Sequence, residues 1–343
     1  MNLEQFGWSD FFSRQCARGI PARVASVCRE QFLVWTEHGE LDAEPGGALR
    51  YESPLWPAVG DWVTLREDAP VIERVLERRT TLSRRQPGSG SSEQVLAANV
   101  DVLFIVSGLD RDYNPRRLER YLVLASESGA RPVILLNKAD LALELGLDLD
   151  EAVQRTRALA GDAVVLPLSA MTDCSLDTLT AELRPGETAA MIGSSGVGKS
   201  TILNRLLGVH RQRTTAVRAG DDRGRHTTTA RELFILPGGP LLIDMPGLRE
   251  VQLWASGDAV DAGFHEIQEL AAECRFRDCA HAGEPGCAVL NAGLDEARLA
   301  NYQKMRRELA YLERRSDPEL ERQTRARWKT IHKAARRHPK RNW

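Results

Sequence analysis

The feature that most constrains the fold of this chain is the segment Gly193-Ser194-Ser195-Gly196-Val197-Gly198-Lys199-Ser200, followed by Thr201. It matches G-x-x-x-x-G-K-[ST], comes after an apolar run at 189–192 and precedes helically spaced apolar residues at 202–207. A glycine-rich turn there lets backbone N–H groups surround phosphate oxygens, and the helix N-terminus adds a favourable dipole. Lys199 is expected to reach the β- and γ-phosphates, and Ser200 to ligate Mg²⁺. The motif predicts a nucleotide-binding α/β domain in which residues 193–201 contact the phosphates.

The surrounding sequence supports such a domain. Apolar runs at 102–106, 132–136, 164–168 and 189–192 read as buried strands, and 116–128 reads as a helix. Residues 233–244 read as a hairpin that turns at Gly238-Gly239. This alternation predicts a mostly parallel sheet covered by helices on both faces.

Two short motifs point to guanine as the base. Asn137-Lys138-Ala139-Asp140 follows an apolar strand and resembles the N-K-x-D motif of GTPases, in which an aspartate accepts from guanine N1–H and the 2-amino group. The Lys138 stem is expected to cover the base, and Asn137 to brace the loop. Ser169-Ala170 resembles the short motif whose backbone N–H contacts guanine O6. Together they favour GTP over ATP.

Two further segments resemble GTPase switch motifs. Asp244-Met245-Pro246-Gly247 resembles D-x-x-G, in which Asp244 holds a Mg²⁺-bound water and the Gly247 N–H contacts the γ-phosphate. Gly224-Arg225-His226-Thr227-Thr228-Thr229 resembles a first switch, where one threonine ligates Mg²⁺. Thr228 is favoured for that role, with Thr227 and Thr229 left open.

The residue after Gly247 bears on how fast such a site would turn over. Leu248 stands where Ras-like enzymes carry the glutamine that orients the attacking water. Leucine cannot hydrogen-bond water, so we expect slow intrinsic hydrolysis that a partner stimulates. His226 is the local candidate for positioning the water, because neutral imidazole accepts a hydrogen bond near pH 7. The alternative is a histidine that only packs in the loop.

The order of these motifs is unusual. Ordinary GTPases begin with the phosphate loop, whereas here Asn137–Asp140 and Ser169-Ala170 come first and Asp244–Gly247 comes last. The sheet can still form, because neighbouring strands need only be close in space. This circular permutation attaches everything after Leu248 directly to the second switch, so we expect movement at Gly247 to be passed into the C-terminal module.

A cysteine cluster lies in that module. Cys274, Cys279, His281 and Cys287 give C-x4-C-x-H-x5-C, a closed set of ligands that suits one structural Zn²⁺. Redox-active thiols and unligated core cysteines are the alternatives. The other three cysteines are scattered, as expected for a reduced cytoplasmic protein and not for a disulfide framework.

The two ends of the chain have distinct character. Short strands expected at 22–27, 31–36 and 60–65 suggest a small N-terminal β-barrel, followed by a polar linker at 86–92. Residues 304–343 carry fourteen Lys/Arg against five Asp/Glu, which suggests a polyanionic partner or simply a solvated helix face. We find neither a secretory signal nor an apolar run of about 18 residues, so no membrane association is expected.

Taken together, the permuted order, G-R-H-T-T-T at 224–229, D-M-P-G at 244–247 and the Cys/His spacing at 274–287 closely resemble the ribosome-small-subunit-dependent GTPases, the RsgA (YjeQ) family. The resemblance implies an OB-fold-like barrel (1–92), a circularly permuted GTPase domain (93–253) and an α-helical zinc module with a basic tail (254–343). It also implies a cytoplasmic GTPase that binds the small ribosomal subunit and its rRNA late in assembly, with ribosome-stimulated hydrolysis of GTP to GDP. A monomer is expected. Some permuted GTPases carry an asparagine at the fourth position of the phosphate loop, in association with activation by potassium. This chain has Gly196 at that position.

Two other functions remain open from the sequence. One is a nucleotide-gated RNA-binding scaffold in which hydrolysis is incidental, although the intact Lys199, Ser200 and Asp244 argue against it. The other is a tRNA-modifying or other translation-associated GTPase, which the permuted order and the lack of a further catalytic module disfavour.

Overall fold

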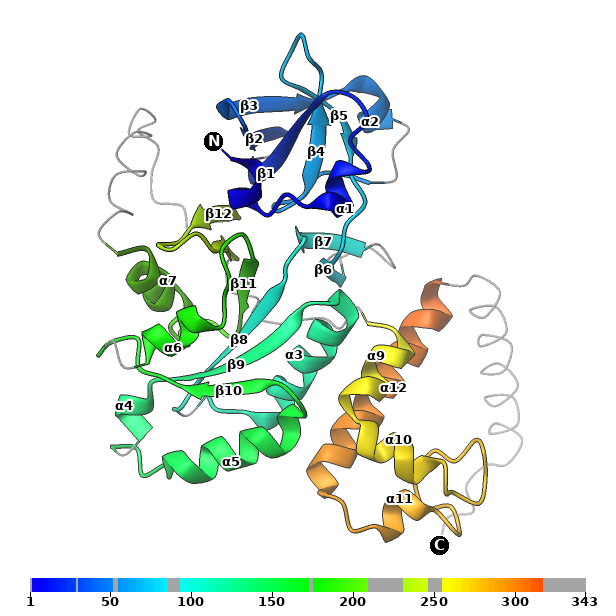
Figure 1. Ribbon diagram of the computed structural model, residues 1–343. Coiled ribbons are helices and arrows are strands. Elements are labelled where there is room, and N and C mark those ends of the chain that lie inside the picture. The colour runs from blue at the N-terminus through cyan, green and yellow to red at the C-terminus, as the bar shows by residue number, and fades with distance from the viewer. Residues whose placement is uncertain are drawn as a thin grey trace, which may run out of the picture. The chain divides into compact units, whose positions relative to one another are not determined.

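A computed structural model describes residues 2–28, 30–51, 55–85, 93–110, 112–142, 144–172, 175–208, 231–245 and 255–316 (Figure 1). The chain forms two compact units, of which the first comprises Met1–Ser83 and Val95–Val251 and the second Arg84–Gln94 and Gln252–Trp343. The first unit holds both the expected barrel and the expected nucleotide-binding sheet. The domain boundaries at 92 and 253 stay predictions.

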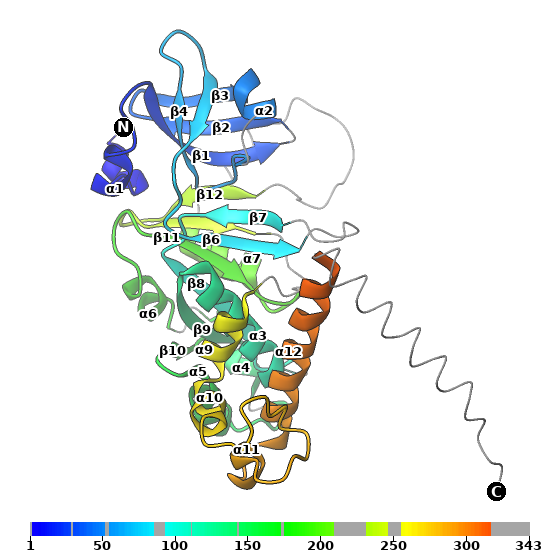
Figure 2. The ribbon, with the colours of Figure 1, turned by 90° about the vertical axis from the view of Figure 1, so that its right-hand side faces the viewer.

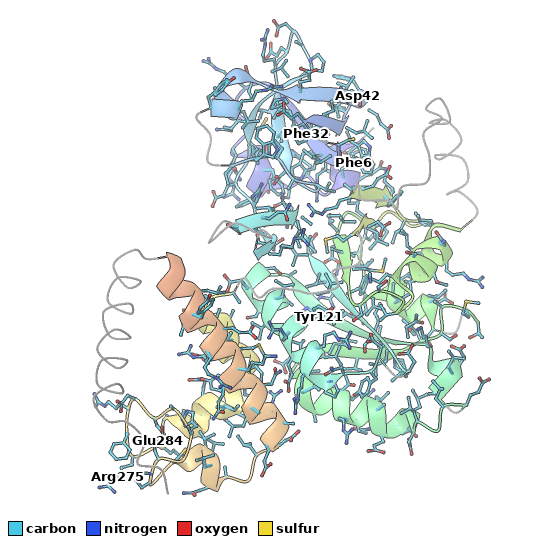
Figure 3. The ribbon with its side chains drawn as sticks, turned by 180° about the vertical axis from the view of Figure 1, so that it is seen from behind. Phe6, Phe32, Asp42, Tyr121, Arg275 and Glu284 are labelled. Carbon is cyan, nitrogen blue, oxygen red and sulfur yellow. The ribbon has the colours of Figure 1, made fainter. Side chains whose placement is uncertain are left out.

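The N-terminal part of the first unit is a closed five-stranded barrel, as predicted. Its strands pair in the order β1-β2-β3-β5-β4, and β4 pairs back onto β1 to close it. Phe32 lies fully buried inside, whereas Asp42 on the third strand is exposed (Figure 3). The elements are η1 (Leu3–Phe6), α1 (Asp10–Ser13), β1 (Ile20–Cys28), β2 (Gln31–Thr36), β3 (Gly39–Pro45), α2 (Gly47–Tyr51), β4 (Trp62–Leu65) and β5 (Val71–Val75). A two-stranded ribbon, β6 (Thr81–Arg85) with β7 (Glu93–Ala98), follows the barrel.

The nucleotide-binding sheet has the predicted parallel core. Its strands lie in the order β10-β9-β8-β11-β13-β12, all parallel except β12, which forms the predicted hairpin with β13. The carboxyl ends of the five parallel strands therefore meet at one edge of the sheet. The elements are β8 (Val102–Gly108), α3 (Pro115–Ser128), β9 (Arg131–Asn137), α4 (Ala139–Ala142), α5 (Leu149–Ala160), β10 (Val164–Pro167), α6 (Leu176–Ala181), β11 (Thr188–Ile192), α7 (Lys199–Leu207), β12 (Glu232–Ile235) and β13 (Leu241–Asp244).

Both faces of this sheet are covered. Successive side chains of a strand point to opposite faces, and β8 divides accordingly. Leu103 and Ile105 pack in one cluster with residues of α3 and α5, whereas Val102, Phe104 and Val106 pack in another with residues of α6 and α7. Burial on both faces explains why the strands read as continuous apolar runs in the sequence.

The barrel and the sheet share one core and one hydrogen-bonded edge. Ser26 of β1 pairs with Glu232 of β12, so the two sheets are continuous (Figure 2). Beside this edge Arg23 is completely buried and donates to Phe6 O (2.6 Å), Asn99 O (3.4 Å) and Thr188 Oγ1 (3.0 Å). Burial lowers the pKa of this guanidinium to about 10, which still leaves it charged near neutral pH. A charge held by groups from both parts fixes the barrel against the sheet.

The second unit is helical, as expected beyond residue 254. Phe264 and Met305 are fully buried in its small core, and the Phe264 ring lies 5.4 Å from that of Tyr302. Arg298 covers Phe264 and pairs with Glu266. Its helices are α9 (Gly257–Gly263), α10 (His265–Ala271), α11 (Ala288–Asn291) and α12 (Glu296–Ser316). Within the described part of the whole chain, no helix is both long and apolar enough to span a membrane.

Candidate nucleotide site and metal centre

The phosphate loop lies where the sequence predicts it, between β11 and α7. Gly193 has φ +149°, and a Cβ there would come within 2.3 Å of Val106 O, so the first glycine is needed for close passage over β8. Gly198 has φ +101° and is the N-cap of α7. Ser195, Gly196 and Ser200 are exposed at the loop surface. The loop thus presents its backbone and the start of a helix at the carboxyl edge of the sheet, an arrangement that suits phosphate.

Asn137 joins this loop to the two guanine motifs. Its side-chain amide donates to Val197 O (2.8 Å) and accepts from the backbone N–H of Ala170 (3.0 Å). A Cβ at Gly198 would come within 2.2 Å of the Asn137 Nδ2 atom, so this glycine leaves room for the asparagine. The bracing predicted for Asn137 thus extends to three loops, which places the base-recognition and phosphate-recognition segments in one site.

Lys199 is buried beneath the phosphate loop. Its ammonium donates to Gly193 O (2.7 Å) and Ser194 O (2.6 Å). Burial lowers the pKa of Lys199 to about 8, although the nearby Asp244 carboxylate acts in the opposite direction. Asp244 ends β13, the strand that pairs with β11. A cation and a carboxylate therefore flank the loop at the positions where phosphate and Mg²⁺ are expected.

The residues of the two guanine motifs differ in exposure. Lys138 has a left-handed backbone with φ +67°, and its ammonium pairs with Asp110 Oδ2 at 2.5 Å. Asp140 is exposed in α4, whereas Ser169 is buried after β10. The structure thus brings the residues of both guanine motifs to the edge that carries the phosphate loop. Asp110 was missed by sequence reasoning, because no local pattern marks it.

Several predicted residues lie outside the described part of the chain. They include His226, Thr227, Thr228 and Thr229 of the first switch, and Gly247 and Leu248 of the second. Their roles stay predictions.

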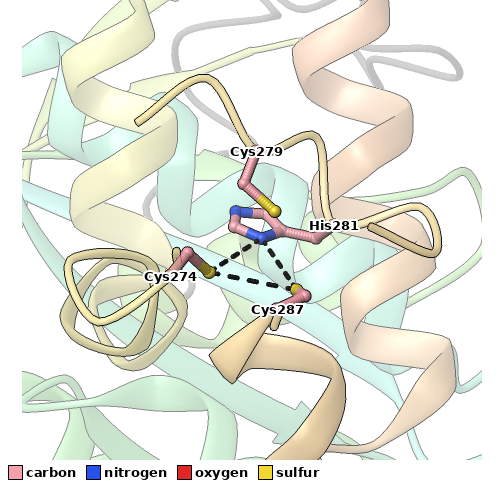
Figure 4. A group of neighbouring side chains, drawn as sticks. All are labelled: Cys274, Cys279, His281 and Cys287. Carbon is pink, nitrogen blue, oxygen red and sulfur yellow. Dashed lines mark hydrogen bonds between the residues drawn. The ribbon is translucent and has the colours of Figure 1, made fainter. Parts of the chain in front are cut away.

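The second unit holds the predicted cysteine and histidine cluster (Figure 4). One ligand atom from each of Cys274, Cys279, His281 and Cys287 lies within 4.8 Å of all the others. His281 Nδ1 is 3.7 Å from Cys274 Sγ and 3.4 Å from Cys287 Sγ, and the two sulfurs are 3.9 Å apart. Tetrahedral bonds of about 2.3 Å to sulfur and about 2.0 Å to nitrogen give ligand separations of roughly 3.5–3.8 Å. The geometry fits one tetrahedral metal ion.

Neighbouring groups hold the ligands in place. The Glu284 carboxylate accepts from Ala280 N (3.1 Å) and Ala282 N (2.7 Å), the residues on either side of His281. Gln303 of α12 donates to His281 O (2.6 Å). These contacts fix the loop that gives His281 its positive φ of 55°. Groups that orient ligands from outside the metal sphere are typical of structural sites.

The thiol chemistry of the cluster also favours a cation. The backbone N–H of His281 lowers the pKa of the Cys279 thiol, but desolvation and the neighbouring sulfurs of Cys287 and Cys274 raise it to about 11. Several thiolates cannot form side by side unless a positive ion compensates their charge. A bound metal ion would provide that compensation.

Comparison with known proteins decides the family. The sequence profile described as RsgA GTPase matches residues 75–254. The chain belongs to the RsgA GTPase family. Among its relatives, the "Small ribosomal subunit biogenesis GTPase RsgA" of Opitutus terrae is 46% identical, over 98% of this chain and 97% of that protein. The protein of the same name from Methanosarcina acetivorans is 44% identical, over 95% and 90% of the two chains.

Solved structures agree with this family and with the permuted fold. YjeQ from Thermotoga maritima is 28% identical, with a TM-score of 0.59 over 85% of this chain and 98% of that one. YloQ, described as a circularly permuted GTPase, is 22% identical, with a TM-score of 0.58 over 86% of this chain and 96% of that one. The fold class predicted from the sequence is thereby confirmed: a barrel, a permuted GTPase sheet and a helical module with a metal-binding cluster.

Proposed function

We propose that this protein is a GTPase that binds the small ribosomal subunit and acts late in its maturation, with hydrolysis stimulated by that subunit. The observation that carries the proposal is near full-length similarity to relatives named for small-subunit biogenesis. The site geometry supports the chemical half of it, because Asn137 joins both guanine motifs to a phosphate loop with its lysine buried beneath. Such a loop supplies positioning and charge for phosphoryl transfer.

Each element of the site has a proposed role in that reaction. Asp140 and a backbone N–H of the Ser169-Ala170 motif recognise guanine, and the stem of Lys138 covers its face. Residues 193–201 hold the phosphates, with Lys199 at the β- and γ-oxygens. Ser200, Thr228 and Asp244 hold Mg²⁺, and Gly247 senses the γ-phosphate.

His226 is proposed to position the attacking water. The His226→Ala variant should therefore lose most of the stimulated GTP hydrolysis. Full retention of the stimulated rate would rule this role out.

The metal in the second unit is proposed to be zinc with a structural role. Three sulfurs and one imidazole at tetrahedral spacing leave no open position for a reacting group. We further propose a cytoplasmic, monomeric protein built from a barrel (1–92), a GTPase domain (93–253) and a zinc module (254–343). The barrel and the zinc module are the parts proposed to contact the ribosome.

The test is GTP hydrolysis measured with and without purified small ribosomal subunits. We expect small subunits to stimulate hydrolysis, because Leu248 cannot orient the attacking water unaided. Large subunits are the control and are expected not to stimulate it. Unchanged turnover, with GTP still bound, would overturn the ribosomal assignment and leave the GTPase assignment standing. Stimulation by transfer RNA alone would favour another translation-associated GTPase, and RNA binding without any hydrolysis would favour a scaffold.

Nucleotide affinity is expected to depend on pH through Lys199. Its pKa is about 8 without nucleotide, and phosphate raises the pKa on binding, so binding above pH 8 takes up a proton. Below pH 8 the ammonium is already charged and the affinity is constant. Because binding takes up one proton once Lys199 is neutral in the free protein, we expect the affinity for GDP to fall about tenfold between pH 7 and pH 9. Titration calorimetry at several pH values measures this, and Lys199→Arg should remove it because arginine stays charged.

A further inference from the structure

The loop between β8 and α3 carries a set of charged contacts to which no role has been assigned. It runs from Leu109 to Asn114, at the carboxyl edge of the sheet beside the phosphate loop. Its backbone is tied to the guanine motif, because Leu109 N donates to Asn137 O (2.7 Å). Side chains of this loop and of the first turn of α3 reach both nucleotide-recognition segments.

One contact reaches the guanine motif. Asp110 pairs with the Lys138 ammonium at 2.5 Å, and its other oxygen accepts from Asp112 N (2.9 Å). Partial burial raises the pKa of Asp110, but the hydrogen bonds from Lys138 and Asp112 outweigh that effect and leave the pKa below its ordinary value. Asp110 is therefore ionised at neutral pH and forms an ion pair with Lys138, the residue of the guanine motif that has a left-handed backbone.

The other contact reaches the phosphate loop. Arg117 forms two parallel bonds to the Asp112 carboxylate (2.9 and 3.0 Å) and a third to Asp112 O (3.0 Å). The same guanidinium donates to the Ser194 hydroxyl in the phosphate loop. Tyr121 lies one turn further along α3 (Figure 3). It is buried, and its side chain also hydrogen-bonds Ser194. Ser194 is itself buried, so its hydroxyl faces α3 and not the solvent.

The position of Arg117 needs an explanation beyond helix stability. It lies in the first turn of α3, where the helix dipole disfavours a cation. Its planar guanidinium nevertheless donates to both oxygens of the Asp112 carboxylate and also to the Ser194 hydroxyl in the phosphate loop. A lysine ammonium cannot make that planar, two-pronged contact.

We propose that Arg117 is a positioning residue for the nucleotide, which acts through Ser194 to hold the phosphate loop in the same register as the guanine motif. The chain of contacts runs from Lys138 through Asp110, Asp112 and Arg117 to Ser194. It sets the distance between the segment that covers the base and the segment that holds the phosphates before the nucleotide binds. The inference rests on the proposed binding of guanine nucleotides.

A preformed spacing strengthens retention of the nucleotide without contacting the reacting atoms. Loss of Arg117 is therefore expected to speed the release of GDP about tenfold, a typical effect of losing one hydrogen bond to a charged group. Single-turnover hydrolysis of saturating GTP should stay within about twofold of the wild-type rate, because uniform binding is lost and not transition-state binding.

The experiment measures release of a fluorescent GDP analogue from the full-length protein by stopped flow. Variants are Arg117→Ala, Arg117→Lys, Ser194→Ala and the Arg117→Ala/Ser194→Ala double variant. Arg116→Ala is the matched control, since it removes an exposed positive charge from the same helical turn. Thermal unfolding of each variant is recorded alongside.

The proposal expects about tenfold faster release for Arg117→Ala and at least that for Ser194→Ala, which also loses the Tyr121 contact. The double variant should release GDP no faster than Ser194→Ala, because the contact between Arg117 and Ser194 is already lost in that single variant. It also expects faster release for Arg117→Lys and wild-type release for Arg116→Ala. Additive effects of about 100-fold, or wild-type release from Arg117→Lys, would overturn it, as would unchanged release from Arg117→Ala. Wild-type protein that binds no guanine nucleotide would instead overturn the proposed function, and this inference with it.

Discussion

Replacement of Lys199 by alanine is expected to slow GTP hydrolysis by at least about 100-fold, because an electrostatic contact to the transferred phosphoryl group is lost. The structure places this ammonium under the phosphate loop, where it donates to the carbonyl oxygens of Gly193 and Ser194. Phosphate oxygens are stronger acceptors than these carbonyls. The measurement is phosphate release under saturating GTP and small ribosomal subunits.

Two further variants test whether the loss of activity in Lys199→Ala comes from the position and shape of this one positive charge. Lys199→Arg keeps the charge but not its compact shape, so partial activity is expected. Arg205→Ala removes a positive charge further along the same helix, where the side chain contacts Met171 O, and is expected to leave the rate unchanged. Full activity in Lys199→Ala would contradict the assignment of residues 193–200 as the phosphate site.

Removal of the metal is expected to unfold most of the second unit while nucleotide binding survives. Structural zinc contributes about 10–16 kcal/mol to the folding of small modules. The second unit has a small core, and the loop of residues 274–287 is held mainly by its ligands and by Glu284 and Gln303. The described nucleotide-site residues all belong to the first unit. Chelation should therefore lower helical content and expose residues 255–316 to protease, yet leave GDP affinity within about twofold.

The matched comparison uses two cysteines. Cys287→Ser removes a buried ligand and should reproduce the effect of the chelator, whereas Cys28→Ser changes an exposed thiol of the barrel and should have no effect. Metal content is measured in each variant by elemental analysis. A protein with no bound metal and a disulfide within the cluster would instead support the redox alternative.

The sequence predicted the nucleotide-binding sheet well, because its strands are buried on both faces and read as apolar runs. Strands β9 and β13 end at Asn137 and Asp244, the first residues of their motifs, and β11 ends at Ile192, directly before the phosphate loop. The barrel was harder. The predicted strand 31–36 matches β2, but β3 (Gly39–Pro45) carries four exposed residues and few residues that favour strands. Its extended form comes from pairing with β2, which is a tertiary effect and leaves no local pattern.

The residues of the candidate site also divide into those that a local sequence pattern marks and those that only the fold brings together. Motif residues could be placed from sequence because each follows a strand, and parallel strands bring their carboxyl ends together. Asp110 and Arg117 could not, since their partners at 138 and 194 are distant in the chain and become neighbours only in the fold. Arg23 was equally hidden, because arginine is ordinarily expected on the surface. Contacts between elements, not composition, determine these three positions.

The junction at Arg23 has a consequence for how the chain folds during synthesis. The strands that close the barrel all lie before residue 76, so it can form early on the nascent chain. Thr188, however, follows Arg23 by 165 residues, and the partner of Ser26 is Glu232. At about 5–20 residues per second, translation from Val75, where the last barrel strand ends, to Thr188 takes roughly 6–23 s. Throughout that interval the nascent barrel carries a guanidinium and a strand edge that later segments will cover, which makes this the period when its own edge is open to mispairing with another chain.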